Sequence, residues 1–266
     1  MKKKKRIPRN EALYNQIQKN EFLSFIDYVE FLRNKVCKSA RMKKMITCLL
    51  IWHKFPNLSA RRAESYLLFL RKFGILRFGI SCFKTLANYR EDNSLLKILD
   101  DLITESSKPL SVIEHDFGTD STGIKTRLFS TWYSLRVKKR IKKRDHITVH
   151  VSMGIKSTIV TALNIETKQG RDNVIFREHV GTTNENFKIN EWSGDGMYWA
   201  KENCKKVTSI GGIPYFKCKS SWNGKQGGCP SWKEMNAKFK EDEKEYGKHY
   251  HKRSKLESGN HSKKAL

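Results

Sequence analysis

Asp145-His-Ile-Thr-Val-His-Val-Ser-Met153 carries a clear strand pattern, because β-branched residues recur along it. Thr158-Ile-Val-Thr-Ala-Leu-Asn164 carries a second such pattern. Upstream, the run Ser111-Val-Ile-Glu-His-Asp-Phe117 predicts a strand that leads to Asp120. We therefore expect a sheet that begins with these three strands.

Helix and strand patterns alternate downstream of these strands. Helices are predicted over residues 171–180 and 198–209, strands over 187–192 and 213–217, and two helical stretches from Ser231 to the end. Strands followed by alternating helices and strands are typical of α/β proteins. We predict an α/β fold for residues 106–266, with residues 106–110 as the linker that precedes its first strand.

The front of the chain has a different pattern, with apolar residues spaced three and four apart across residues 7–105. This spacing predicts an all-helical domain over residues 1–105. The domain starts with the basic arm Met1-Lys-Lys-Lys-Lys-Arg6. No apolar stretch follows that arm, so it does not read as a secretory signal and we expect a cytoplasmic protein.

A pair of helices in this front domain is compatible with a helix-turn-helix. Gly74 and Gly79 separate a helical pattern from the segment Ser81-Cys-Phe-Lys-Thr-Leu-Ala-Asn-Tyr-Arg90. In that interpretation the segment is a recognition helix, and Lys84 and Arg90 face DNA. The alternative is a plain pair of packed helices with polar residues outward.

The charge of the chain indicates a polyanionic partner. Lysine and arginine number 53 against 27 acids, which gives a net charge of +26. Such a charge attracts nucleic acid or an anionic membrane. The longest apolar runs, such as Met45-Ile-Thr-Cys-Leu-Leu-Ile-Trp52, are shorter than the roughly 18 residues of a spanning helix. We therefore expect DNA as the partner and no membrane.

Four residues near the C-terminus repeat at helical spacing. Tyr250, Arg253, Glu257 and Lys264 are three, four and seven residues apart, which places them on one stripe of a helix. A carboxylate flanked by cations suits a metal ligand beside a polyanion. The alternative is a surface ion pair between Arg253 and Glu257, worth a few tenths of a kcal/mol.

This Tyr-x2-Arg-x3-Glu-x6-Lys pattern resembles the signature of one large group of insertion-sequence DDE transposases. Asp120-Ser-Thr-Gly-Ile124 and Asp195-Gly-Met-Tyr198 resemble further motifs of the same family, and the resemblance spans about residues 110 to 264. It implies an RNase H-like catalytic domain in which Asp120, Asp195 and Glu257 are the catalytic acids. It also implies that Tyr250, Arg253 and Lys264 contact DNA phosphates near the scissile bond.

The three acids would act by holding divalent metal ions. Two-metal cleavage of a phosphodiester needs carboxylates from separate segments that converge on the ions. Oxygen ligands favour Mg²⁺ or Mn²⁺, so Asp120, Asp195 and Glu257 are the predicted metal ligands. Asp116 is the rival for the first position, and simple turns are the alternative roles of Asp120 and Asp195.

The resemblance implies cleavage and strand transfer of an insertion sequence, and we expect a homodimer on DNA. The chain ends at Leu266, whereas members of that family continue beyond the Glu-bearing helix. We therefore expect a C-terminally truncated catalytic domain with impaired activity. A catalytically inactive, transposon-derived DNA-binding protein is the alternative.

Overall fold

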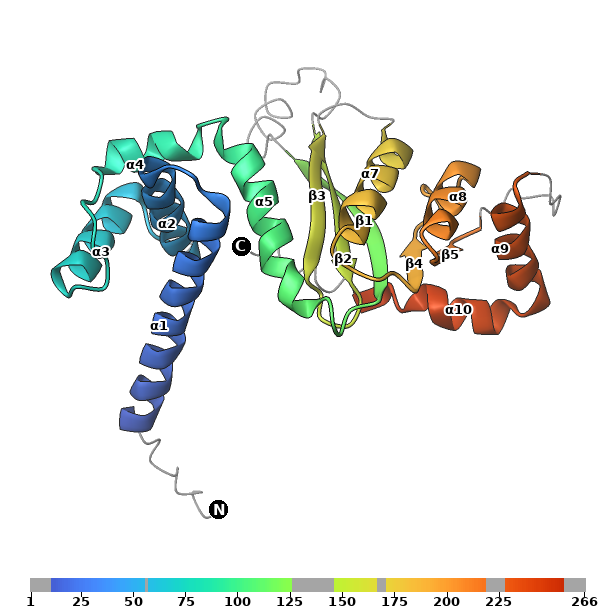
Figure 1. Cartoon of the computed structure of the whole chain (residues 1–266), viewed down its shortest axis with the longest axis horizontal. Coiled ribbons are helices and arrows are strands. Elements are labelled where there is room, and N and C mark those ends of the chain that lie inside the picture. Colours follow the sequence, from blue (N-terminus) through green and yellow to red (C-terminus); the bar gives the residue numbers. More distant parts are fainter. Residues whose placement is uncertain (1–10, 56, 126–145, 167–170, 219–227, 256–266) are drawn as a thin grey trace, which may run out of the picture. The chain divides into compact units, whose positions relative to one another are not determined.

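The computed structural model describes residues 11–55, 57–125, 146–166, 171–218 and 228–255. The chain divides into two compact units, residues 1–105 and 106–266. Helices form the described part of the first unit, and a five-stranded sheet with helices forms the second (Figure 1). The prediction of a helical region followed by an α/β region is confirmed.

The helical region consists of α1 (Glu11–Val36), α2 (Ala40–Lys54), α3 (Ala60–Lys72), α4 (Phe83–Arg90) and α5 (Leu95–Ser107). Ser39 and Ser59 cap α2 and α3, since their side chains accept hydrogen bonds from the backbone N–H of Met42 and Arg62. The apolar residues that predicted these helices face a common core, which includes Met45, Ile51, Leu67, Leu70 and Leu86.

The two helices of the predicted helix-turn-helix, α3 and α4, pack against each other. Residues 73–82 connect them, and Gly74 in this segment has a positive φ of 73°. The connection is longer than the roughly three- to four-residue turn of a helix-turn-helix. The packed pair exists, but its connection departs from that motif.

The sheet of the second unit contains β1 (Asp116–Lys125), β2 (His146–Gly154), β3 (Val160–Glu166), β4 (Glu191–Gly194) and β5 (Ile213–Phe216). The strand order is β3-β2-β1-β4-β5. β2 pairs antiparallel with β1 and β3, whereas β4 pairs parallel with β1 and β5. β1 is therefore the central strand, where the antiparallel and parallel halves meet.

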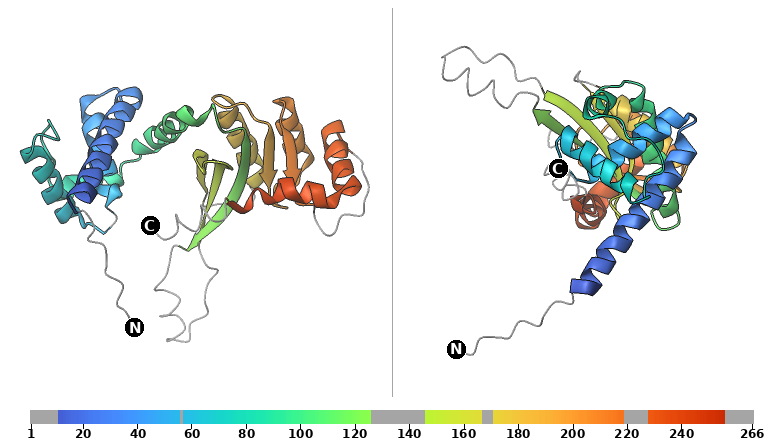
Figure 2. Two further views of the ribbon diagram at one scale, coloured as in Figure 1. Left: turned by 90° about the horizontal axis from the view of Figure 1, so that it is seen from below. Right: turned by 90° about the vertical axis from the view of Figure 1, so that its left-hand side faces the viewer.

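Helices pack on this sheet from both sides. α7 (Asp172–Asn184) and α8 (Lys201–Ser209) share an aromatic core with Phe117 and Trp192, which point to one face of β1 and β4. The neighbouring residues Asp116 and Glu191 point to the other face and contact Lys252, the residue after α10 (Glu243–His251). α9 (Pro230–Glu241) precedes α10. Figure 2 shows α10 beside the sheet, apart from α7 and α8.

The predicted linker and the first predicted strand are displaced in the structure. Residues 106–110 continue as the end of α5 and a 3₁₀ turn (Lys108–Leu110), in which Pro109 takes an early helical position. β1 begins only at Asp116, and Val112 is 81% exposed. The apolar residues before Asp116 are thus not the strand; pairing with β2 and β4 fixes where β1 lies.

The strand predicted over residues 187–192 also begins later in the structure. The predicted strand over residues 187–192 is β-structure only from Glu191. Phe187 and Ile189 are buried in the core while their backbone is a loop, so burial alone gave them a strand-like pattern.

Candidate functional site

Asp120 and Asp195 lie at neighbouring strands at the same level of the sheet. The parallel pairing of β1 and β4 ends with Thr119 opposite Gly194. Asp120 is the next residue of β1, and Asp195 directly follows β4. Both carboxylates are close enough to raise the pKa of the Tyr198 hydroxyl, which lies three residues after Asp195. The structure thus brings together two aspartates that are far apart in the sequence.

A tight turn holds Asp195. Its Oδ1 accepts a hydrogen bond of 2.8 Å from the backbone N–H of Met197, and its carbonyl accepts one of 3.1 Å from the N–H of Tyr198. This is the Asx turn that was the alternative role for this residue. None of the ion pairs among the described residues involves Asp195. The turn therefore fixes the carboxylate without neutralising it.

Asp120 faces the end of α10. Arg253 Nη2 lies 3.5 Å from Asp120 Oδ1, and the two side chains are 10% and 13% exposed. Arg253 Nη1 donates to the hydroxyl of Tyr250 at 3.1 Å, and the guanidinium lies 5.7 Å from the centre of the Tyr250 ring. Three residues of two separate motifs, Asp120, Tyr250 and Arg253, therefore form one contact cluster.

The helix predicted for the C-terminal motif is interrupted by a turn within the described residues. α10 ends at His251, and Lys252 and Arg253 form a turn in which the Arg253 N–H donates to the Tyr250 carbonyl. The turn lets Lys252 and Arg253 both reach acidic side chains of the sheet, which an uninterrupted helix would point apart. Glu257 and Lys264 lie outside the described residues.

Lys252 ties the end of α10 to β1 and β4. Its Nζ lies 3.1 Å from Asp116 Oδ2 and 2.8 Å from Glu191 Oε2. His249 Nδ1 lies 2.8 Å from Glu191 Oε1, and its ring stacks on Tyr215 at 4.7 Å. Asp116, the rival for the first catalytic position, is therefore engaged by Lys252.

The same contacts shift the ionisation of these groups. Burial would raise the pKa of Glu191, but hydrogen bonds from Lys252 and His249 outweigh it and lower the pKa below its usual value. Burial likewise opposes the charge of Lys252, yet Glu191 and Asp116 raise the pKa of its ammonium group. Both groups are stabilised in their charged forms.

A buried polar network lies on the opposite face of the sheet. His150 Nδ1 lies 3.1 Å from the Tyr198 hydroxyl, and His150 Nε2 lies 3.6 Å from Asp172 Oδ1 at the start of α7. Tyr198 also hydrogen-bonds Ser121, the residue after Asp120. This network connects the loop that carries Asp195 to β1 and β2.

Burial keeps this network neutral. It lowers the pKa of His150, although Asp172, Glu166 and Asp195 pull it upward. It raises the pKa of the Tyr198 hydroxyl, and Asp195, Asp172 and Asp120 raise it further. At neutral pH the imidazole is uncharged and the phenol keeps its proton, so the network positions groups by hydrogen bonding.

The ligand set around Asp120 and Asp195 is compatible with a divalent ion in its chemistry. Carboxylate oxygens are the ligands that Mg²⁺ and Mn²⁺ prefer. Among the residues that the structure describes, no group of three or more His, Cys, Asp or Glu side chains is placed to hold a metal ion. The third predicted ligand, Glu257, is outside that part of the chain.

The predicted DNA-contacting residues of the helical unit lie on α4. Lys84 is exposed, and the Arg90 guanidinium lies 5.0 Å from the centre of the Trp52 ring of α2. Arg90 thus combines an exposed position with a packing role.

Sequence reasoning did not single out several residues of the site. Lys252 and Glu191 hold α10 on the sheet, and Asp172 lies beside the histidine that contacts Tyr198. One signal was available, because Lys252 adjoins Arg253 in the C-terminal motif. The partners of Lys252 are more than 60 residues away in sequence, and no local pattern identifies them.

Comparison with known proteins leaves the structure as the main guide to function. No model of a protein family matches the chain, and no curated protein matches it. Within the described part of the chain, none of the helices has the length and apolar character needed to cross a membrane.

Proposed function

We propose that residues 106–266 form an RNase H-like catalytic domain and that the chain is a DDE-type DNA transposase of an insertion sequence. DNA is its substrate, as transposon ends and as target, and the chain acts in the cytoplasm as a homodimer on DNA. The helical unit supplies DNA binding. The sequence resemblance, the net charge of +26 and the geometry at Asp120 and Asp195 support this proposal.

One observation carries the proposal, namely the register of β1 and β4. The resemblance requires the first acid on a central strand, the second just after a neighbouring strand and the third on a C-terminal segment beside them. Asp120 lies on the central strand, Asp195 directly follows the adjacent strand, and α10 packs on β4 and β5. The Asp120 and Asp195 motifs, which are far apart in the sequence, are thus on adjacent strands, and two-metal chemistry needs carboxylates from separate segments that converge in this way.

The protein groups have separate tasks in this mechanism. Asp120, Asp195 and Glu257 would hold Mg²⁺ or Mn²⁺, and the ions would supply positive charge that favours attack on the phosphodiester. The Asx turn keeps the Asp195 carboxylate in place. Arg253 and Tyr250, joined by their 3.1 Å hydrogen bond, hold the DNA phosphate beside Asp120, and Lys264 binds a further phosphate.

A second candidate function is DNA binding without cleavage, and one contact favours it. The Arg253 guanidinium lies within ion-pair distance of Asp120, so it competes with a metal ion for that carboxylate. In this candidate the acids serve only to hold Arg253 and α10 in place.

Metal-dependent nicking distinguishes the two functions. The full chain is incubated with supercoiled plasmid that carries the ends of its element, with Mg²⁺, with Mn²⁺ or with EDTA. We expect nicking with either metal. Asp195→Asn should abolish nicking while DNA binding persists, because the loss of one negative charge hardly alters the net charge of +26. Glu202→Gln, at an exposed position of α8, is the matched control and should cut normally.

Either of two results contradicts the enzyme. Asp195→Asn cutting at the wild-type rate would remove Asp195 from the site. If the wild-type protein binds DNA but does not cut it with either metal, the enzyme proposal is wrong and DNA binding without cleavage is the function that stands.

A further inference from the structure

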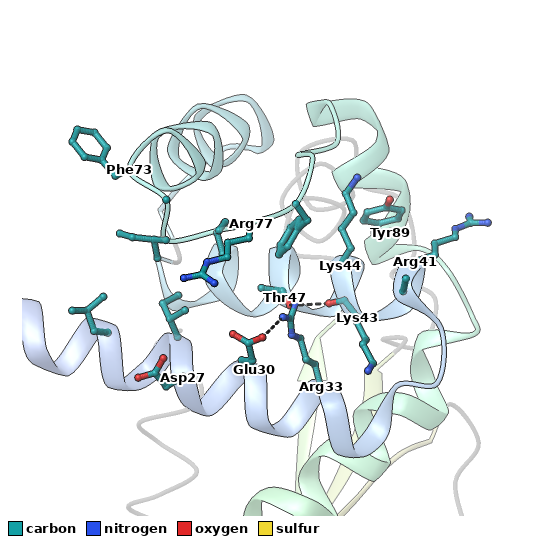
Figure 3. Close-up of a pocket in the computed structure, with 17 residues that line it drawn as sticks. Asp27, Glu30, Arg33, Arg41, Lys43, Lys44, Thr47, Phe73, Arg77 and Tyr89 are labelled. Carbon is teal, nitrogen blue, oxygen red and sulfur yellow. Dashed lines mark hydrogen bonds and ion pairs between the residues drawn. The ribbon is translucent and has the colours of Figure 1, made fainter.

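A large cavity opens in the helical unit between α1, α2 and the segment after α3. It measures about 1030 Å³, and Tyr89 of α4 forms part of its wall. Five cationic side chains line it, against the two carboxylates of Asp27 and Glu30; the cations are Arg33, Arg41, Lys43, Lys44 and Arg77. We call it the cationic groove. Figure 3 shows Arg77 across the groove from the Glu30–Arg33 pair, with Lys44 beside Tyr89.

Arg33 is a fixed cation at the floor of this groove. Its Nη2 donates to Glu30 at 2.6 Å and its Nη1 donates to Thr47 Oγ1 at 3.2 Å, while its guanidinium lies 5.8 Å from the Phe78 ring centre. Its Nε is buried and has no hydrogen-bond partner within the described residues. A buried donor without a partner is uncommon in folded proteins and calls for an explanation.

The other cations of the groove differ from Arg33, which pairs with Glu30. Arg41, Lys43, Lys44 and Arg77 form no ion pair among the described residues. Three of them stand in the first turns of α2, whose first turn contains no acid. Cations at a helix N-terminus oppose the helix dipole and destabilise the helix. Their position thus opposes folding and favours an anionic ligand.

We propose that the cationic groove binds the phosphate backbone of DNA, an assignment that rests on the proposed function and locates its DNA-binding site. Arg41, Lys43 and Lys44, near the N-terminus of α2, form one positive surface with Arg77. Phosphate contacts of this kind add affinity without reading sequence. The groove, rather than the exposed face of α4, then supplies most of the salt-dependent binding of the helical unit.

Salt-dependent binding of the full chain tests this assignment. Fluorescence anisotropy with a short random-sequence DNA duplex is measured for the wild type and for Lys44→Gln/Arg77→Gln over a range of salt. Each lost phosphate contact reduces the slope of log affinity against log salt by about 0.9, so the double variant should be shallower by about 1.8. We expect its affinity at low salt to fall roughly tenfold or more.

Two matched pairs serve as controls, each removing one lysine and one arginine. Arg62→Gln/Lys97→Gln changes exposed residues outside the groove and should keep the wild-type slope. Lys84→Gln/Arg90→Gln changes α4 and should affect binding less than the groove pair. Circular dichroism melting checks folding; if Lys44→Gln/Arg77→Gln is unfolded, Arg41→Gln/Arg77→Gln, at two exposed positions, replaces it.

The outcomes separate this inference from the function it rests on. Equal losses in the groove pair and the Arg62/Lys97 pair would show a general charge effect and overturn the groove. A larger loss in the Lys84/Arg90 pair would assign binding to α4 and also overturn it. Wild type that does not bind the duplex at low salt would overturn both the groove and the proposed function.

Discussion

Arg253 and Asp120, 133 residues apart in sequence, meet at 3.5 Å where the end of α10 reaches the central strand. Both side chains are nearly buried, so water screens the pair only weakly. The pair joins the first acidic motif to the C-terminal basic motif. It also means that any ligand of Asp120 must share that carboxylate with a guanidinium.

Removing Arg253 should destabilise the second unit. Arg253→Ala removes the guanidinium that lies beside Asp120 Oδ1, and breaking a nearly buried pair costs about 2–4 kcal/mol in the free energy of unfolding. Urea denaturation followed by circular dichroism measures this change. Lys255→Ala, at an exposed position two residues later, should change stability by about 0.5 kcal/mol or less. Equal effects of the two changes would mean that the pair contributes nothing.

Substitutions of Asp116 and Asp120 should have different effects, the first on the stability of the fold and the second on DNA cleavage. Asp116→Asn weakens the contact with Lys252 Nζ, so we expect a lower free energy of unfolding, by about 1 kcal/mol, with nicking retained. Asp120→Asn should abolish nicking. The comparison uses the plasmid assay together with thermal melting of both variants. Loss of nicking in Asp116→Asn alone would reverse the assignment of the first carboxylate.

The anchor of α10 should weaken in acid. The pKa of Glu191 is below its usual value in the folded chain, so its contribution to stability is present above the unfolded pKa of about 4.3 and is lost as pH falls through the lower folded pKa. Glu191→Gln should therefore flatten the fall in stability between about pH 5 and pH 3. Denaturation at each pH measures it. Glu234→Gln, from a surface pair with Lys238, should leave the wild-type curve unchanged.

A buried histidine should add a second loss at mildly acidic pH. Burial, with the charge of His150, lowers the pKa of His179 to about 4. The unfolded chain binds a proton at a pKa of about 6.5, so stability should fall as pH drops from about 6.5 to 4, by roughly 3 kcal/mol.

His179→Gln tests this second loss, because glutamine can still hydrogen-bond Ser152 Oγ but does not titrate. The variant should lose less stability than the wild type across that pH range. His53→Gln, at an exposed histidine of α2, should follow the wild-type curve. Wild-type and His179→Gln curves of the same shape would contradict the prediction.

Local patterns predicted the elements better than their boundaries. β2 and β3 lie close to their predicted positions, since β-branched residues mark the part of each strand that packs. β1 was placed too early because Val112 and Ile113 are apolar yet exposed, while its real residues, Asp116 to Lys125, are largely polar. A central strand can hold such residues because its backbone pairs on both sides, which local sequence does not reveal.

The motif residues of the candidate site could be predicted from the sequence, but the residues that hold them in place could not. The motifs named Asp120, Asp195, Tyr250 and Arg253, and the structure groups Asp120 with the last two. The turn at Lys252 was missed because helical spacing continues through it. That turn depends on acids of β1 and β4, so it follows from tertiary contacts rather than from helix propensity.

The contact between Arg253 and Asp120 also sets an order of events while the chain is being made. The helical unit is built from local contacts and can fold as soon as it leaves the ribosome. β1 emerges next, but its Arg253 partner follows 133 residues later. At about 5–20 residues per second, Asp120 waits several seconds before that cation exists. The contact of Arg253 with the central strand therefore forms late, and closure of α10 onto the sheet is a late step in folding.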